Sequence, residues 1–173
     1  MKQEQKSPNV RFTTMFDLYG LPNDFPGYKF AQTCNDPYAK VDGLEKEMCE
    51  DIRQTTSDDR FIPYIQLHEY EALLFSDIRQ LGSEFLKRDR EIEQLVQSVR
   101  QIASPELIND DPQKAPSKRI IDFIPEYDGR KASSGPRIAG RIGIDSLRQK
   151  CPHFDAWVSK LLSLPSSQAS LSL

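Results

Sequence analysis

The sequence predicts one mixed α/β domain in which a small parallel sheet is followed by a mainly helical C-terminal half. Two short segments, Val10–Phe16 and Phe61–Leu67, are rich in aromatic and β-branched residues, which favours strands. A helix pattern separates them, and two strands joined by a helical crossover run parallel. We therefore expect an α/β portion over residues 1–78, a helical portion of the same domain over residues 79–164, and a disordered tail over residues 165–173.

The crossover helix has the clearest local pattern. Asp36 and Pro37 are typical of a helix start, because aspartate caps free N–H groups and proline fits the first helical position. The helix is expected over Tyr38–Gln54, and its apolar residues recur at steps of three and four: Val41, Leu44, Met48 and Ile52. In the second strand, Pro63 has no N–H to donate, so the strand should be unpaired there or lie at a sheet edge.

The C-terminal half shows shorter helix patterns separated by breakers. We expect helices over Glu69–Phe75, Ser83–Ala103, Ala115–Ile124, Arg137–Ile142, Asp145–Lys150 and His153–Leu164, with a loop over Tyr127–Pro136. His153, at the start of the last of these helices, is interpreted as a structural residue.

A parallel sheet of only two strands should not be stable by itself. The sheet is therefore expected to include strands that the pattern does not reveal, or to be completed by a segment before Met1 or by another chain. The last alternative predicts a homo-oligomer or a partner protein.

Composition narrows the class of protein. The chain has 23 basic and 26 acidic residues and a net charge of -3, so no global positive field indicates nucleic-acid binding. Its three cysteines lack metal-type spacing, which suits free thiols in a cytoplasmic protein. No apolar run approaches the roughly 18 residues of a membrane span, so we expect no membrane partner.

Polar side chains follow both predicted strands. Asp17 comes at the end of the first strand, and His68, Glu69 and Glu71 follow the second. In open α/β sheets, ligands bind beyond the carboxyl ends of the strands, which makes these four residues the candidates for a catalytic site. Each also has a structural interpretation: Asp17 as a loop cap, the glutamates as favourable charges at a helix start, and His68 as a hydrogen-bonded core histidine.

Long strings of the sequence resemble a bacterial family catalogued as domain of unknown function 4276. They are TTMFDLYGLPNDFPG (Thr13–Gly27), RFIPYIQLHEYEALLFSD (Arg60–Asp77), IND followed by APSKRI (within Ile108–Ile120) and IAGRIGIDSLRQKCPHFDAWVSKL (Ile138–Leu161). That family is similar to TOPRIM domains, whose Rossmann-type sheet carries the active sites of topoisomerases, primases and some nucleases. Its members are often encoded beside ATPases in what look like phage-defence operons.

The resemblance implies a metal-dependent nuclease or other phosphoryl-transfer site that acts on nucleic acid. Asp17, Glu69 and Glu71 would then hold Mg²⁺ or Mn²⁺, ions that suit hard oxygen ligands, and His68 would orient a ligand or a water. Asp17 matches the first acid of the TOPRIM DxD motif, whereas Tyr19 occupies the second position. The family's first-strand glutamate, in a segment resembling VEGxTE, has no counterpart here, so the sheet is expected to be incomplete at the N-terminus.

Basic residues of the C-terminal half are candidates for phosphate binding. They are Lys114, Lys118, Arg119, Arg130 and Lys131, within a stretch that is more basic than the rest of the chain. Ordinary solvated helix surfaces also carry such residues. Two function classes thus remain: a TOPRIM-like nuclease that works with a partner ATPase, and a non-catalytic interaction module that completes its sheet with another chain.

Overall fold

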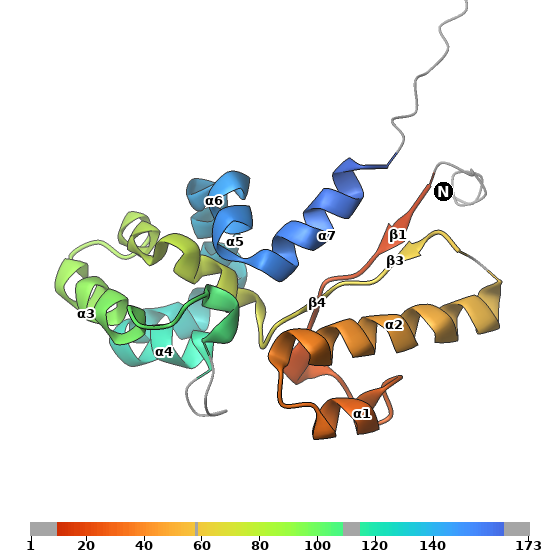
Figure 1. Ribbon diagram of the computed structural model, residues 1–173. Helices are drawn as coiled ribbons and strands as arrows, with labels where there is room; N and C mark the ends of the chain where they lie inside the picture. The colour runs from red at the N-terminus through yellow and green to blue at the C-terminus, as the bar shows by residue number, and fades with distance from the viewer. Residues whose placement is uncertain (1–9, 58, 109–114, 165–173) are drawn as a thin grey trace, which may run out of the picture.

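A computed structural model describes residues 10–57, 59–108 and 115–164 (Figure 1). The fold is mixed α/β and mainly helical, with two short parallel strand pairs. In chain order the elements are β1 (Phe12–Thr13), β2 (Phe16–Asp17), η2 (Leu18–Gly20), α1 (Tyr28–Thr33), α2 (Pro37–Thr56), β3 (Phe61–Ile62), β4 (Ile65–Gln66), η3 (Tyr70–Ser83), α3 (Asp89–Val99), η4 (Pro105–Leu107), α4 (Pro116–Phe123), η6 (Pro125–Arg130), α5 (Lys131–Ile142), α6 (Ile144–Lys150) and α7 (Pro152–Leu162), where η denotes a 3₁₀ segment.

The four strands form one interrupted ribbon. β1 pairs with β3 and β2 pairs with β4, both parallel, as the sequence predicted, and the two pairs share one register. The interruption falls at Pro63 and Tyr64, which confirms the expected gap in pairing. There the Tyr64 N–H donates to Thr14 Oγ1 over 3.1 Å, and the Thr14 hydroxyl donates to the Tyr64 carbonyl over 3.2 Å. A threonine side chain thus replaces the missing backbone ladder.

Two helices cover this ribbon, which lies between α2 and α7 (Figure 1). Side chains alternate along the strand, as a period of two requires. Ile65 and Leu67 pack in the small apolar cluster with α2, whereas Tyr64 belongs to the larger cluster and stacks on Trp157 of α7 at 4.5 Å between ring centroids. The ribbon therefore gains its stability from helices rather than from further strands among the described residues.

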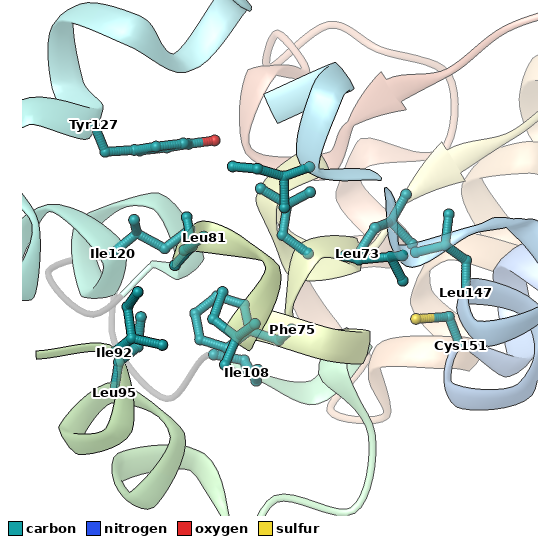
Figure 2. Close-up of a cluster of buried hydrophobic side chains, with 14 of the residues drawn as sticks. Leu73, Phe75, Leu81, Ile92, Leu95, Ile108, Ile120, Tyr127, Leu147 and Cys151 are labelled. Atoms are coloured by element: carbon teal, nitrogen blue, oxygen red, sulfur yellow. The ribbon is translucent and has the colours of Figure 1, made fainter. Parts of the chain in front are cut away.

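The larger cluster lies in the helical half, around η3 (Figure 2). Leu73, Leu74 and Leu81 of η3 are fully buried, and α3, α4 and α5 pack around them. Among the described residues, no helix is both long enough and apolar enough to cross a membrane.

Three predicted boundaries were wrong. The helix expected over Glu69–Phe75 is a 3₁₀ segment that continues to Ser83 across a kink at Asp77. The helix expected over Ser83–Ala103 is confined to α3. Lys87, just before α3, adopts a positive φ of 65°, which a continuous helix does not allow. The loop expected over Tyr127–Pro136 is largely helical, since it forms part of η6 and α5. The expected tail over residues 165–173 lies outside the described residues.

Candidate functional site

The acidic strand ends come together at one end of the ribbon. Asp17 is the last residue of β2, directly opposite Gln66 of β4, and Glu69 and Glu71 follow Gln66 by three and five residues. The Tyr70 N–H, between the two glutamates, donates to Asp17 Oδ1 over 2.8 Å. This bond fixes Asp17 against the start of η3. We call Asp17, Glu69 and Glu71 the acidic site.

Like charges interact within the acidic site. Partial burial raises the pKa of Asp17, the Tyr70 N–H opposes this shift, and the charge of Glu69 adds to it. Burial also raises the pKa of Glu71, and the charge of Glu69 again adds to it, against the Tyr127 hydroxyl and Lys131. Because Glu69 acts on both of the other carboxyl groups, the three residues share one electrostatic site.

Each acid also has a structural partner. The Glu69 carboxylate accepts hydrogen bonds from the backbone N–H of Ser117 and from its hydroxyl, the latter over 3.1 Å, and so caps the start of α4. Glu71 accepts from the Tyr127 hydroxyl over 3.2 Å. These bonds agree with the structural interpretation of the acids, because each residue connects two segments that are far apart in the sequence.

His68 lies in the short link between β4 and η3, directly before Glu69. It is buried and adopts a positive φ of 65°, which turns the chain from β4 toward η3. Its ring centroid is 5.3 Å from that of Tyr19, and its carbonyl accepts the Tyr19 N–H over 3.1 Å. Burial together with the charge of Glu69 raises the pKa of Tyr19 to about 12, so this phenol keeps its proton at neutral pH.

A groove of about 670 Å³ opens beside Asp17. Apolar residues of β2 and of the segments just before and after it, together with one residue of η3, form most of its wall: Met15, Phe16, Leu21, Pro22, Phe25 and Tyr70. Asp17 also lines this groove, so a ligand bound there would lie next to this residue.

Several of the basic residues proposed for phosphate binding pair with other groups of the protein, although Lys131 also acts electrostatically on Glu71. Arg130 pairs with Glu84 and lies over the Phe85 ring, and Lys131 pairs with Asp128. Lys118 is exposed on α4, Arg119 is half-buried, and Lys114 lies outside the described residues. Two of these cations are therefore already engaged by groups of the protein.

A second group of side chains could hold a metal ion, and sequence reasoning missed it. Asp42 and Glu45 of α2 and His153 of α7 each offer one ligand atom, and these atoms all lie within 4.8 Å of one another. Of the described residues, only these three satisfy that spacing, so the acidic site does not. Asp42 and Glu45 stand three positions apart on one helix, which is a visible signal, but nothing local connects them to His153.

His153 is held between carboxylates. Its Nε2 lies 2.9 Å from Glu45 Oε1, and its Nδ1 lies 3.7 Å from Asp42 Oδ1. Burial lowers the pKa of this imidazole, but the hydrogen bond and charge of Glu45, with the charges of Glu106 and Asp42, outweigh burial and raise it. The structural role expected of His153 is thus a link between α7 and α2.

These features define a class: a mixed α/β, mainly helical domain with an acidic site at the end of a short parallel ribbon. The chain belongs to the family described as domain of unknown function (DUF4276), whose family model matches residues 1–162. Comparison with curated proteins and with solved structures gave no match.

Proposed function

We propose that this protein is a TOPRIM-like, metal-dependent phosphoryl-transfer domain that acts on nucleic acid, with Asp17, Glu69 and Glu71 as ligands of Mg²⁺ or Mn²⁺. The observation that carries this proposal is that Asp17, at the end of β2, lies beside Glu69 and Glu71, which follow β4, and borders an open groove. Among the described residues, the ligand oxygens of these three acids do not all lie within 4.8 Å of one another, so metal binding requires their side chains to move closer together. A bound cation would offset the repulsion that Glu69 exerts on both neighbours.

The acidic site offers carboxylate oxygens, the ligand type that a hard divalent ion prefers. Asp17 accepts the Tyr70 N–H through Oδ1, and Glu71 accepts the Tyr127 hydroxyl through Oε1. Both oxygens of Glu69 accept from Ser117, but a carboxylate oxygen has a second lone pair to offer. When bound, the ion would activate an attacking water and stabilise the leaving oxygen. His68, whose ring lies close to that of Tyr19, would orient a metal ligand or a water.

Calorimetric titration with Mg²⁺ and Mn²⁺ tests the proposal. The wild-type protein should bind one ion, and Asp17→Asn should weaken binding at least about tenfold because it removes one charge while keeping an oxygen for the Tyr70 N–H. Asp24→Asn, in the exposed loop, is the matched control and should bind normally. Cleavage of single- and double-stranded DNA and RNA should require the same carboxylate.

Absence of binding by either ion, or equal binding by wild type and Asp17→Asn, would remove the basis for a nuclease. Cooperation with a partner ATPase in phage defence remains a prediction of the family resemblance.

A second function, a non-catalytic interaction module, is favoured by the outer edge of β1 and β2. The N–H groups of Phe12 and Phe16 donate to carbonyls at the neighbouring strand. The backbone N–H and C=O groups of the alternate residues Thr13 and Met15 therefore point away from that strand. The side chains of Phe12, Met15 and Phe16 are also exposed. An unpaired edge with exposed apolar residues favours pairing with a strand of another chain.

Light scattering after size exclusion tests this second function. We expect a dimer that Met15→Lys converts to a monomer, because a charge on the edge opposes strand addition. A wild-type protein that is monomeric at all concentrations would contradict self-association through this edge.

A further inference from the structure

Helices α2 and α7 meet at three side chains that can bind metals. Asp42 and Glu45 lie on the same face of α2, since residues three apart are neighbours on a helix. His153 is at the start of α7, 108 residues after Glu45. The side chains of Glu45 and His153 are buried, whereas Asp42 is 70% exposed. The group therefore has a fixed inner part and one ligand at the surface.

The inner part is held by the surrounding fold. Glu45 Oε1, which bonds His153 Nε2, also accepts the Ile65 N–H over 2.7 Å. The imidazole stacks on the Tyr64 ring, with 5.2 Å between centroids and 20° between planes. These contacts fix the ring plane and its direction, as the surroundings of metal-binding histidines generally do. By contrast, the 3.7 Å between Nδ1 and Asp42 Oδ1 is too long for a hydrogen bond.

We propose that Asp42, Glu45 and His153 form a binding site for a divalent transition-metal ion of the zinc type, separate from the acidic site. Ligand atoms bound at about 2.0–2.3 Å from one ion lie within about 4.5 Å of one another, close to the observed spacing of 4.8 Å or less. Glu45 lies at Nε2 of the ring and Asp42 at Nδ1, so the exposed Asp42 must turn toward the Nε2 side for both carboxylates to bind the same ion. One imidazole nitrogen with two carboxylate oxygens suits Zn²⁺, Co²⁺ or Fe²⁺, whereas Mg²⁺, Mn²⁺ and Ca²⁺ prefer oxygen alone.

The site leaves coordination positions open to solvent. A groove of about 770 Å³ borders Asp42 and Glu45, with Lys46, Cys49 and Pro63 also in its wall. Three protein ligands do not complete the coordination of such an ion, so water from this groove fills the remaining positions. Binding replaces the proton that His153 shares with Glu45, and that proton is released to solvent.

An ion at this position would connect the two parts of the fold. Asp42 and Glu45 belong to the helix that covers the ribbon on one side, and His153 belongs to the helix that covers the other side. Because a ligand that binds only the folded state stabilises it by mass action, the ion raises the unfolding temperature.

Calorimetry and thermal unfolding with Zn²⁺ and Co²⁺ alone test the proposal on the full chain. We expect one ion per chain and a higher unfolding temperature. Asp42→Asn should lower the affinity at least about tenfold and largely abolish the thermal shift. The Asp42 side chain is exposed and makes no hydrogen bond to described residues, so the Asp42→Asn variant should fold. Asp51→Asn, an exposed residue of the same helix, carries the same change of charge and should bind as wild type.

Two further variants make the result decisive. His153→Gln should abolish binding, and Asp17→Asn should leave it intact, because the acidic site is separate. The proposal is overturned if neither ion binds, if binding survives both Asp42→Asn and His153→Gln, or if the Co²⁺ spectrum shows thiolate ligation, which would place the ion at a cysteine.

Discussion

At the scale of single residues, buried and half-buried acids act as acceptors for backbone N–H groups of distant segments. Burying a charge costs free energy unless hydrogen bonds compensate, and helix starts provide free N–H groups for this purpose. The pairs are Asp17 with Tyr70, Glu45 with Ile65, Glu69 with Ser117, and Glu106 with His153 and Phe154. Acidic side chains thus fix how the segments of this fold are joined.

Glu106 gives the strongest test of this role. It is fully buried, and its two oxygens accept the N–H groups of His153 and Phe154 over 3.0 and 2.9 Å, at the start of α7. Glu106→Ala leaves both donors buried without an acceptor, so we expect the free energy of unfolding to fall by about 3 kcal/mol. Urea unfolding measures this change. The exposed Glu93→Ala should change stability by less than about 0.5 kcal/mol.

The same residue predicts a pH dependence. Burial raises the pKa of Glu106 above its ordinary value of 4.5, although the N–H groups of His153 and Phe154 oppose the shift. The folded protein therefore holds this proton more tightly than the unfolded chain, and the corresponding stability is present below pH 4.5 and lost as the pH rises through the raised pKa. Glu106→Gln cannot ionise, so its stability relative to wild type should rise from pH 4.5 to pH 7. A constant difference in urea unfolding would show that Glu106 does not titrate there.

Sequence reasoning reached the acids at the strand ends but not their partners. Asp17 and Glu69 follow recognisable strands, so a rule about strand ends selects them. Nothing local shows that Glu69 caps a helix 48 residues later, or that His153 reaches Glu45 across 108 residues. Contacts of this kind depend on tertiary packing, which local patterns do not encode.

At the scale of elements, prediction succeeded where local signals agreed. Asp36 caps α2 by accepting the Ala39 N–H over 2.6 Å, and Pro37 occupies the first helical position, as predicted. It failed for α5, which contains Gly135 and Pro136. Both residues oppose helix, but Gly135 allows α5 to approach η3 so closely that a Cβ would lie 3.3 Å from the Tyr70 ring. Close packing of this helix outweighs its weak propensity.

Helix α7 stabilises the strand ribbon chiefly through Trp157. Its ring stacks on Tyr64, and its indole N–H donates to Thr13 Oγ1 over 2.9 Å. Since Trp157 is half-buried, Trp157→Ala should lower the free energy of unfolding by about 2–3 kcal/mol, whereas Trp157→Phe, which keeps the stacking and loses the hydrogen bond, should cost about 1 kcal/mol.

Far-UV circular dichroism in urea measures both variants. Leu162→Ala removes a 68% exposed side chain from the same helix and serves as the control. If Trp157→Ala were as stable as this control, α7 would not hold the ribbon.

At the scale of the whole molecule, there are two apolar clusters of unequal size, and each is in contact with a residue from the other half of the chain. Among the described residues, the larger contains eighteen buried residues and the smaller contains five. Tyr64, from the strand ribbon, belongs to the larger cluster, and Leu107, from the helical half, packs against the smaller. The smaller cluster is too limited to support an independent unit, so both portions should fold together.

This sharing predicts a single cooperative unfolding transition. Trp157 is the one tryptophan of the chain and lies at the contact between α7 and the ribbon, so its fluorescence reports on that contact, whereas circular dichroism reports on all helices. The two urea curves should coincide, and Glu106→Ala should move both midpoints by the same amount, because loosening α7 removes support from both clusters. If fluorescence changed at lower urea than circular dichroism, the contact between α7 and the ribbon would be lost while the helical half stayed folded. Helix α7 and the ribbon would then not belong to one cooperative folding unit.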